Sequence, residues 1–189
     1  MPQYFEQLND CFAKTEASGP NRRRISVEKA IGKAVRQIAT SAGRGNKVAI
    51  IGNGGSAAIA SHTAIDFLKN AQVPAIAFND ASFLTCLTND LGYDAVFAKP
   101  ISILSQRGDI LIAISSSGRS SNILKAVKAA KGKKNFIITL SGFSRTNFLR
   151  KMGDINFYVP SFSYGFVEIT HSVICHWISD RLMHPRAHG

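Results

Sequence analysis

The chain has 189 residues, 45% of them hydrophobic and 19% charged, which is typical of one globular domain with a packed core. No run approaches the roughly 20 apolar residues of a membrane-spanning helix, and the first residues lack the basic and apolar parts of a secretory signal. We therefore expect a cytoplasmic protein without a membrane partner.

The net charge of +11 comes from 23 Lys and Arg residues against 12 Asp and Glu residues. Apart from residues 22–24 and 131–134 the cations are scattered, and neither cluster is interleaved with aromatic residues. Nucleic-acid binding is therefore the weaker hypothesis, and steering of anionic substrates is the simpler one. The three cysteines, Cys11, Cys86 and Cys175, are widely separated and odd in number, so we expect core thiols rather than disulfides or a zinc ribbon.

Two helices are predicted at the start of the chain, over residues 3–17 and 25–43, with Ser-Gly-Pro-Asn at 18–21 between them. The second has apolar residues at helical spacing. We expect one domain with an N-terminal helical segment at 1–45, an α/β core at 46–183 and a tail at 184–189.

Short apolar strands alternate with helices from residue 47 onward. Strands are predicted over 47–51, 74–78, 109–114, 135–140 and 155–159, and helical segments over 55–70, 80–104, 120–131 and 164–183. This alternation is typical of a doubly wound parallel sheet, here of about five strands, with helices on both faces. Ligands of such sheets bind beyond the carboxyl ends of the strands.

A glycine-rich turn, Gly52-Asn53-Gly54-Gly55-Ser56, stands between the first of these strands and its helix. Glycine allows close approach of the backbone to a ligand, and a helix N-terminus attracts anions. The turn lacks the Lys-Ser/Thr ending of a nucleotide P-loop, and Ala57 occupies the third glycine position of a dinucleotide motif. We therefore expect an anion site without a nucleotide cofactor.

A second turn of this kind, rich in serine, runs from Ser115 to Asn122 after the strand at 109–114. Its hydroxyl groups are suited to surround one phosphate. A single turn of either kind also occurs as a plain connection, but two in one domain indicate a phosphorylated small molecule as ligand.

Two helices carry side chains with catalytic or metal-binding potential. His62 and Asp66 are four residues apart on one helix face, and Glu168 precedes His171 and His176 on the last helix. If these faces converge, His62, Asp66, Glu168 and one of the two later histidines suit Zn²⁺ or a similar ion. The same set suits a metal-free acid/base pair, and each member alone is also compatible with an ordinary structural role.

These motifs together resemble the sugar isomerase domain, and within it the phosphoheptose isomerases. The resemblance spans nearly the whole chain and rests on an ordered set: Gly52-Asn53-Gly54-Gly55-Ser56, Ser61-His62, Asn89-Asp90-x-Gly92, Gly108-Asp109-x-Leu111, Ile114-Ser115-Ser116-Ser117-Gly118-x-Ser120 and the stretch from His171 to His176. It implies a flavodoxin-like sheet, a homotetramer with active sites at subunit boundaries, and interconversion of sedoheptulose 7-phosphate with a heptose 7-phosphate.

The resemblance also assigns roles to residues. Substrate and phosphate binding falls to Asn53, Gly54, Ser56, Asp90, Ser115, Ser116, Ser117 and Ser120, metal binding to His62, Asp66, Glu168 and His176, and catalysis to Asp66 and His176. Asp66 stands where the family usually has glutamate. Glu168 stands where it usually has glutamine, which strengthens the case for a divalent metal, most simply Zn²⁺.

A non-catalytic family member is the alternative, either a sugar-phosphate sensor or a protein-binding module such as the relative that associates with the bacterial replication initiator. That relative lacks a histidine matching His176. Because this chain has both His62 and His176, catalysis is the favoured hypothesis.

Overall fold

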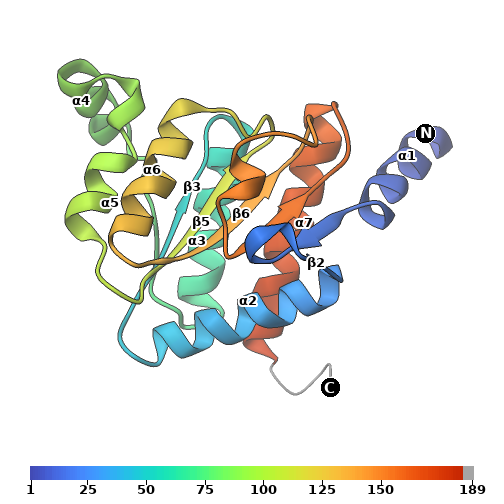
Figure 1. Ribbon diagram of the computed structural model, residues 1–189, viewed down its shortest axis with the longest axis horizontal. Helices are drawn as coiled ribbons and strands as arrows, with labels where there is room; N and C mark the ends of the chain where they lie inside the picture. Colours follow the sequence, from blue (N-terminus) through green and yellow to red (C-terminus); the bar gives the residue numbers. More distant parts are fainter. Residues whose placement is uncertain (185–189) are drawn as a thin grey trace.

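A mostly parallel sheet runs through the middle of the protein, whose computed structural model describes residues 1–184 (Figure 1). Within these residues its seven strands lie in the order β2-β1-β7-β6-β5-β3-β4. Their bounds are β1 Glu16–Ser18, β2 Arg24–Ile25, β3 Val48–Ile51, β4 Ala75–Ala77, β5 Ile110–Ser115, β6 Phe136–Ser141 and β7 Ile155–Tyr158. The five strands from β7 to β4 are parallel, and their order is that of a flavodoxin-like fold, so the predicted fold class is confirmed.

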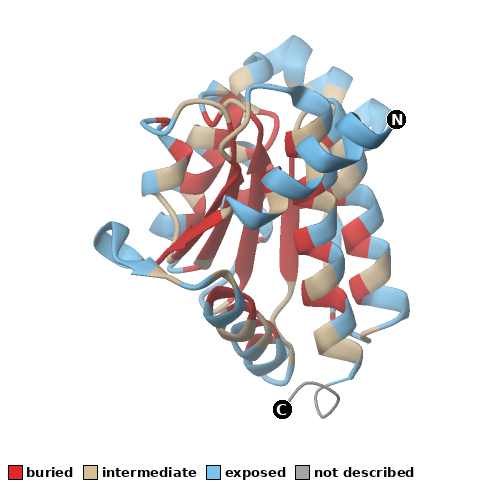
Figure 2. Cartoon of the chain, turned by 90° about the vertical axis from the view of Figure 1, so that its right-hand side faces the viewer, coloured by how far each residue is buried: buried red, intermediate tan, exposed pale blue. Residues whose placement is uncertain are grey.

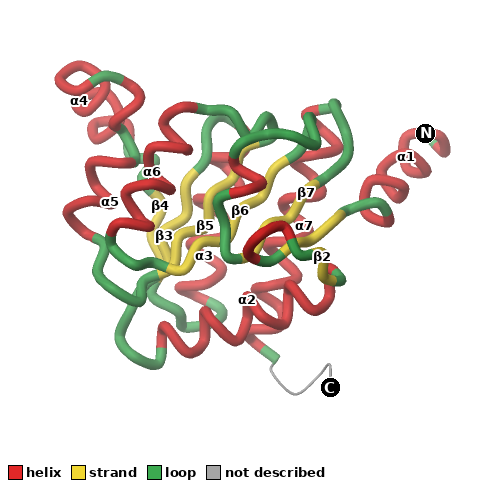
Figure 3. The backbone as a smooth tube through the Cα atoms, viewed as in Figure 1, coloured by secondary structure: helices red, strands yellow, loops and turns green. Residues whose placement is uncertain are grey.

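Helices cover both faces of the sheet (Figures 1 and 3). They are α1 Pro2–Ala13, α2 Val27–Ala42, α3 Gly55–Lys69, α4 Ala81–Leu91, α5 Ala98–Leu104, α6 Ser121–Gly132 and α7 Tyr164–Met183, with single 3₁₀ turns η1 Pro20–Arg22, η2 Tyr93–Ala95 and η3 Leu149–Lys151. The central strands are apolar at successive positions because both of their faces are buried.

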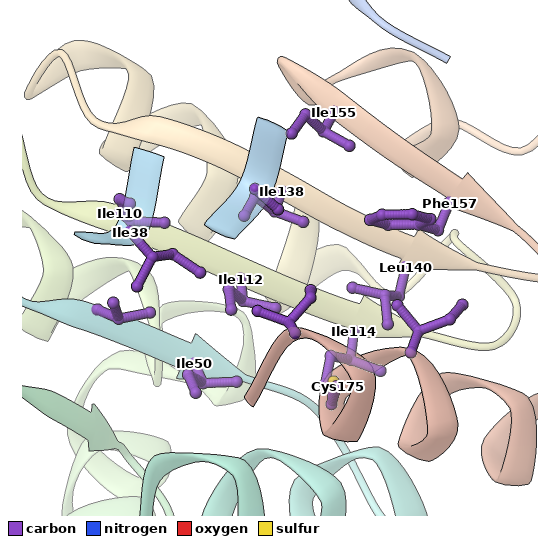
Figure 4. Close-up of a cluster of buried hydrophobic side chains, with 14 of the residues drawn as sticks. Ile38, Ile50, Ile110, Ile112, Ile114, Ile138, Leu140, Ile155, Phe157 and Cys175 are labelled. Atoms are coloured by element: carbon purple, nitrogen blue, oxygen red, sulfur yellow. The ribbon is translucent and has the colours of Figure 1, made fainter. Parts of the chain in front are cut away.

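Alternation along each strand divides the core into two layers. Ile50 and Ile112 point toward α2, α3 and α7, whereas Ile51 and Ala113 point toward α5 and α6. Figure 4 shows the first layer, in which Cys175 of α7 packs among the isoleucines of the strands. Burial therefore concentrates along the sheet and the inner faces of the helices (Figure 2).

The predicted helix at 3–17 is wrong at its end. Helix α1 stops at Ala13, and Glu16–Ser18 form β1, which pairs antiparallel with β7 and with β2. Such short strands depend on a partner far along the chain, so local periodicity does not reveal them. The predicted helix at 25–43 starts later, at Val27, because the Ser26 hydroxyl accepts a hydrogen bond from the Lys29 amide at 3.2 Å.

The helical segment predicted at 80–104 is divided into α4, η2 and α5. Gly92 ends α4 with a φ of 79°, a conformation that glycine adopts without steric cost. Cys11 and Cys175 are buried as expected, but the prediction is wrong for Cys86, which is exposed on the outlying α4. Residues 185–189 of the predicted tail lie outside the described residues. Within residues 1–184, each helix is too short or too polar to cross a membrane.

Candidate active site

The two phosphate-type turns meet at one edge of the sheet. Strands β3 and β5 are parallel neighbours, and each is followed directly by one of the turns. The turns enclose a cavity of about 260 Å³. It is lined by Asn53, Gly54, Gly55, Ser56, Ser115, Ser116, Ser117, Ser120, Tyr164 and Glu168. All the predicted phosphate-binding residues except Asp90 are thereby brought together.

Two helix N-termini favour an anion among the serines of this cavity, whereas the Glu168 carboxylate lies in its wall on the α7 side. Helices α3 and α6 begin at Gly55 and Ser121, within the last residues of the two turns, so both present the positive ends of their dipoles to the cavity. The Ser116 hydroxyl is buried and has no hydrogen-bond partner among the described residues. A ligand oxygen would supply that missing partner.

Asn53 is held in place by two residues that the sequence analysis missed. It exchanges hydrogen bonds with Asn122, Nδ2 to Oδ1 at 3.0 Å in one direction and 2.9 Å in the other. The Tyr93 hydroxyl also donates to Asn53 Oδ1 at 2.9 Å. These bonds tie the glycine turn to the serine turn. Asn53 therefore orders the cavity, and the position of Asn122 at the end of the serine turn was the one clue in the sequence.

Two glycines are required by close packing around the cavity. Gly118 has a φ of 60°, and a β-carbon there would collide with Asn147. A β-carbon at Gly55 would collide with the carboxylate of Glu168. Helix α7 therefore approaches the first turn of α3 closely, and its residues Tyr164 and Glu168 complete the cavity wall.

A histidine–aspartate–histidine cluster lies further along the same two helices. His62 Nε2 and His176 Nδ1 are each 3.4 Å from the same oxygen of Asp66, Oδ2. One potential ligand atom from each residue lies within 4.8 Å of the other two. The other carboxylate oxygen accepts a hydrogen bond from Asn70 at 3.2 Å. Three donors that converge on one point suit a divalent cation, and this donor set is one that Zn²⁺ accepts.

The structure selects His176 over His171 for this cluster. His171 is fully buried, and its Nε2 lies 3.3 Å from the carbonyl oxygen of Ser141. Burial lowers the pKa of His171 to about 4, so the imidazole is neutral at physiological pH. The side chain of His176 is 47% exposed and accessible to a ligand. His171 is therefore a core residue.

Comparison with known proteins places this geometry in a family. The family model described as SIS domain matches residues 4–142. The chain belongs to the SIS domain family. It is 35% identical over 185 residues to the phosphoheptose isomerase of Shewanella oneidensis, with 94% of this chain and 93% of that protein covered. It is 36% identical over 173 residues to the phosphoheptose isomerase of Cytophaga hutchinsonii, with 84% and 90% covered.

Solved structures agree with this assignment to the SIS domain family. The phosphoheptose isomerase from Francisella tularensis superposes with a TM-score of 0.83 at 30% identity, over 96% of this chain and 95% of that one. The enzyme from Neisseria gonorrhoeae superposes with a TM-score of 0.80 at 28% identity, over 96% of both chains. The resemblance inferred from the motifs is therefore confirmed.

Two of the predicted site residues of this SIS domain, Glu168 and Asp90, lie away from the groups to which they were assigned. Glu168 was expected among the metal ligands, and Asp90 among the substrate-binding residues. The Glu168 carboxylate lies against Gly55 in the cavity wall, and the eight residues that separate it from His176 correspond to about 12 Å of helix. Asp90 is exposed on α4, where Asn89 donates a hydrogen bond to it at 2.8 Å. Arg119, in the serine turn, has its guanidinium 5.8 Å from the centre of the Phe148 ring.

Proposed function

We propose that this protein is a ketose/aldose isomerase that interconverts sedoheptulose 7-phosphate and a heptose 7-phosphate. The observation that carries the proposal is the pairing of two sites on α3 and α7: a hydroxyl-lined anion cavity and, further along both helices, the His62–Asp66–His176 cluster. Relatives that match most of this chain are named phosphoheptose isomerases, which supports the same activity.

The spacing of the two sites suits a substrate of this length. Glu168, in the cavity wall, and His176 are separated by about 12 Å along α7. An extended seven-carbon sugar with a terminal phosphate spans on the order of 10 Å from phosphorus to C1. With its phosphate among the serines, the substrate would direct C1 and C2 toward the cluster. Glu168 then accepts hydrogen bonds from sugar hydroxyls between the two sites.

The chemistry is the transfer of a proton between C1 and C2 through an enediol. It requires a base that removes one proton from carbon and a second group that transfers protons at the oxygens of C1 and C2. When no ion is bound, Asp66 and His176 fit these roles because His176 Nδ1 lies 3.4 Å from Asp66 Oδ2, so a carboxylate and an imidazole face the same space. Asp66 has a side-chain exposure of 17%, which limits competition from water.

The cluster is suited to a divalent ion, and we propose His62, Asp66 and His176 as its ligands, with Zn²⁺ the simplest choice. The ion, when bound, polarises the substrate carbonyl as a Lewis acid. Glu168, which the resemblance assigned as a further ligand, lies in the wall of the anion cavity and is not grouped with these three residues.

Metal analysis is expected to find close to one divalent ion per chain in the purified protein. Asp66→Asn removes the anionic ligand that both histidines face, so its metal content should fall severalfold. The control is Asp90→Asn, which removes an exposed carboxylate on α4 and should retain the ion. Elemental analysis that finds equal metal in Asp66→Asn and wild type would contradict this ligand assignment.

The proposed reaction is tested with sedoheptulose 7-phosphate in deuterated water, with the C1 and C2 signals followed by NMR. Aldose signals with solvent deuterium at C2 would establish isomerisation through an enediol. Binding of the sugar, seen as a shifted phosphorus signal, without conversion or exchange would overturn catalysis of this substrate. That result would favour the non-catalytic sugar-phosphate-binding alternative.

Ser117→Ala is expected to raise KM about tenfold while kcat changes little. The Ser117 hydroxyl lies in the cavity wall and accepts a hydrogen bond from the Arg119 amide at 3.3 Å, so its own proton is available to a phosphate oxygen. Steady-state kinetics measures the effect, with Ser102→Ala on the exposed side of α5 as control. A fall in kcat at constant KM would instead place Ser117 in the chemical step.

We also propose that copies of the chain assemble, as a homotetramer, over the surface beside the cluster. Ile65, Leu68, Ile169 and Val173 are exposed on α3 and α7 next to the half-exposed His62 and His176. A second copy there would bury this apolar surface and shield the cluster from water. Light scattering gives the mass, and Leu68→Asp should dissociate the assembly.

The cytoplasmic location stays a prediction.

A further inference from the structure

A second strongly basic region lies at the β1–β2 end of the sheet, away from the serine cavity. Two adjoining hollows of about 320 and 370 Å³ are formed where the turn around η1 approaches η3. Both are lined by Arg22, Arg150 and Lys151. Among the described residues, they share none with the wall of the serine cavity. This region therefore offers a separate place for a ligand.

The charge of the two hollows is unbalanced. Five cationic residues line them: Arg22, Arg24, Arg145, Arg150 and Lys151. Within residues 1–184, Glu16 is the one acidic residue in their walls. One carboxylate facing five cations leaves a concentrated positive potential, which attracts anions from solution.

Glu16 arranges the arginines more than it neutralises them. Its side chain is 8% exposed, and its two oxygens accept hydrogen bonds from Arg145 and Arg150, each at 2.5 Å. Arg24 adds a longer ion pair at 3.6 Å. Because a guanidinium carries five N–H donors, each arginine keeps donors that the carboxylate does not use.

Arg150 is fixed on several sides before any ligand arrives. Its guanidinium carbon lies 4.1 Å from the centre of the Tyr158 ring, and its Nη1 donates to the Arg145 carbonyl oxygen at 3.1 Å. The side chain is only 18% exposed. A cation that is already ordered loses little conformational freedom on binding, so more of the interaction energy contributes to affinity.

The remaining two shared cations have no such internal partners. The side chains of Arg22 and Lys151 are exposed and make no hydrogen bond or ion pair with any of residues 1–184. They stand beside Arg150 in both hollows, where like charges repel one another. An anion placed between the hollows would relieve this repulsion and use the unused donors.

We propose that the two hollows form a binding site for a small molecule that carries two or more linked phosphate groups. Guanidinium groups match phosphate oxygens in a bidentate manner, and two hollows on either side of shared cations suit two linked anionic groups better than one. The site is distinct from the one that holds the sugar phosphate and does not depend on the isomerase reaction.

Pyrophosphate is the probe, titrated calorimetrically into the wild-type protein near physiological salt, where weak surface attraction is screened. Arg22→Ala/Lys151→Ala removes two exposed cations that line both hollows, and we expect its affinity to fall about tenfold or more. The matched control, Lys131→Ala/Lys133→Ala, removes two exposed cations at the C-terminal end of α6 and should bind as the wild type does. Pyrophosphate held in the serine cavity contributes equally to all three proteins.

Three results would overturn the proposal. The Arg22→Ala/Lys151→Ala protein binds pyrophosphate as tightly as the wild type. The control loses as much affinity as the site variant, which means that overall charge is responsible. A short single-stranded oligonucleotide binds in a manner that depends on Arg22 and Lys151 while pyrophosphate fails to displace it, which means that the region recognises a nucleic acid.

Discussion

Replacing His176 with alanine should reduce turnover of sedoheptulose 7-phosphate by about 10³-fold, within the range that a positioned acid or base contributes. His176 is half-exposed, so its removal leaves the core unchanged, yet it takes away the imidazole 3.4 Å from Asp66. His62→Ala removes the second imidazole that faces the same oxygen, and a loss of similar size is expected.

Steady-state kinetics and light scattering together test this prediction. His184→Ala is the control, because His184 is exposed at the end of α7, eight residues beyond His176. The His62 and His176 variants should keep the wild-type mass and thermal stability. A variant with an intact assembly and an unchanged rate would remove that histidine from the mechanism.

The stability of the protein should fall in mild acid because of His171. Its folded pKa of about 4 lies below the ordinary value of 6.5, so between these values the unfolded chain binds a proton that the folded protein excludes. The contribution of the neutral histidine to the free energy of unfolding is complete above pH 6.5. It is lost as the pH falls toward 4. From about pH 7.5 to about pH 5, the free energy of unfolding should decrease by about 2 kcal/mol from this group.

Urea denaturation at the two pH values measures this effect. In His171→Asn the buried position no longer titrates, so the difference between the two pH values should shrink by about the same 2 kcal/mol. The variant is expected to be less stable at neutral pH, but the test rests on the pH difference. The exposed His184→Asn is the control and should behave like the wild type. An unchanged pH difference in His171→Asn would show that His171 takes up its proton as readily in the folded protein as in the unfolded chain.

The position of the anion cavity followed from local patterns. Each Gly/Ser turn stands directly after an apolar strand and before a helix, and the carboxyl ends of neighbouring parallel strands meet at one edge. The strand β5 is fully buried and therefore apolar at successive positions, which made it visible in the sequence. The residues between Ser115 and Ser120 could be placed beside Ser56 for that reason.

The N-terminal region was predicted poorly because its structure depends on distant contacts. Glu16–Ser18 follow α1 without a break signal, and they form a strand by pairing with β2 and with β7, the latter more than a hundred residues later. The pairing with β7 brings Glu16 to Arg145 and Arg150. No local sequence pattern therefore predicts the basic hollows. Arg22–Arg24 alone looked like an ordinary solvated cluster.

The sequence by itself determined the alternation of strands and helices, the two phosphate-type turns and the pairing of His62 with Asp66, because each depends on residues within a few positions of one another. Residue spacing left both His171 and His176 open and the family resemblance favoured His176, but only the tertiary structure placed His176 beside Asp66 and Glu168 in the cavity. Both histidines lie on one helix, and the packing of α7 against α3 and the sheet sends one into the core and the other to Asp66.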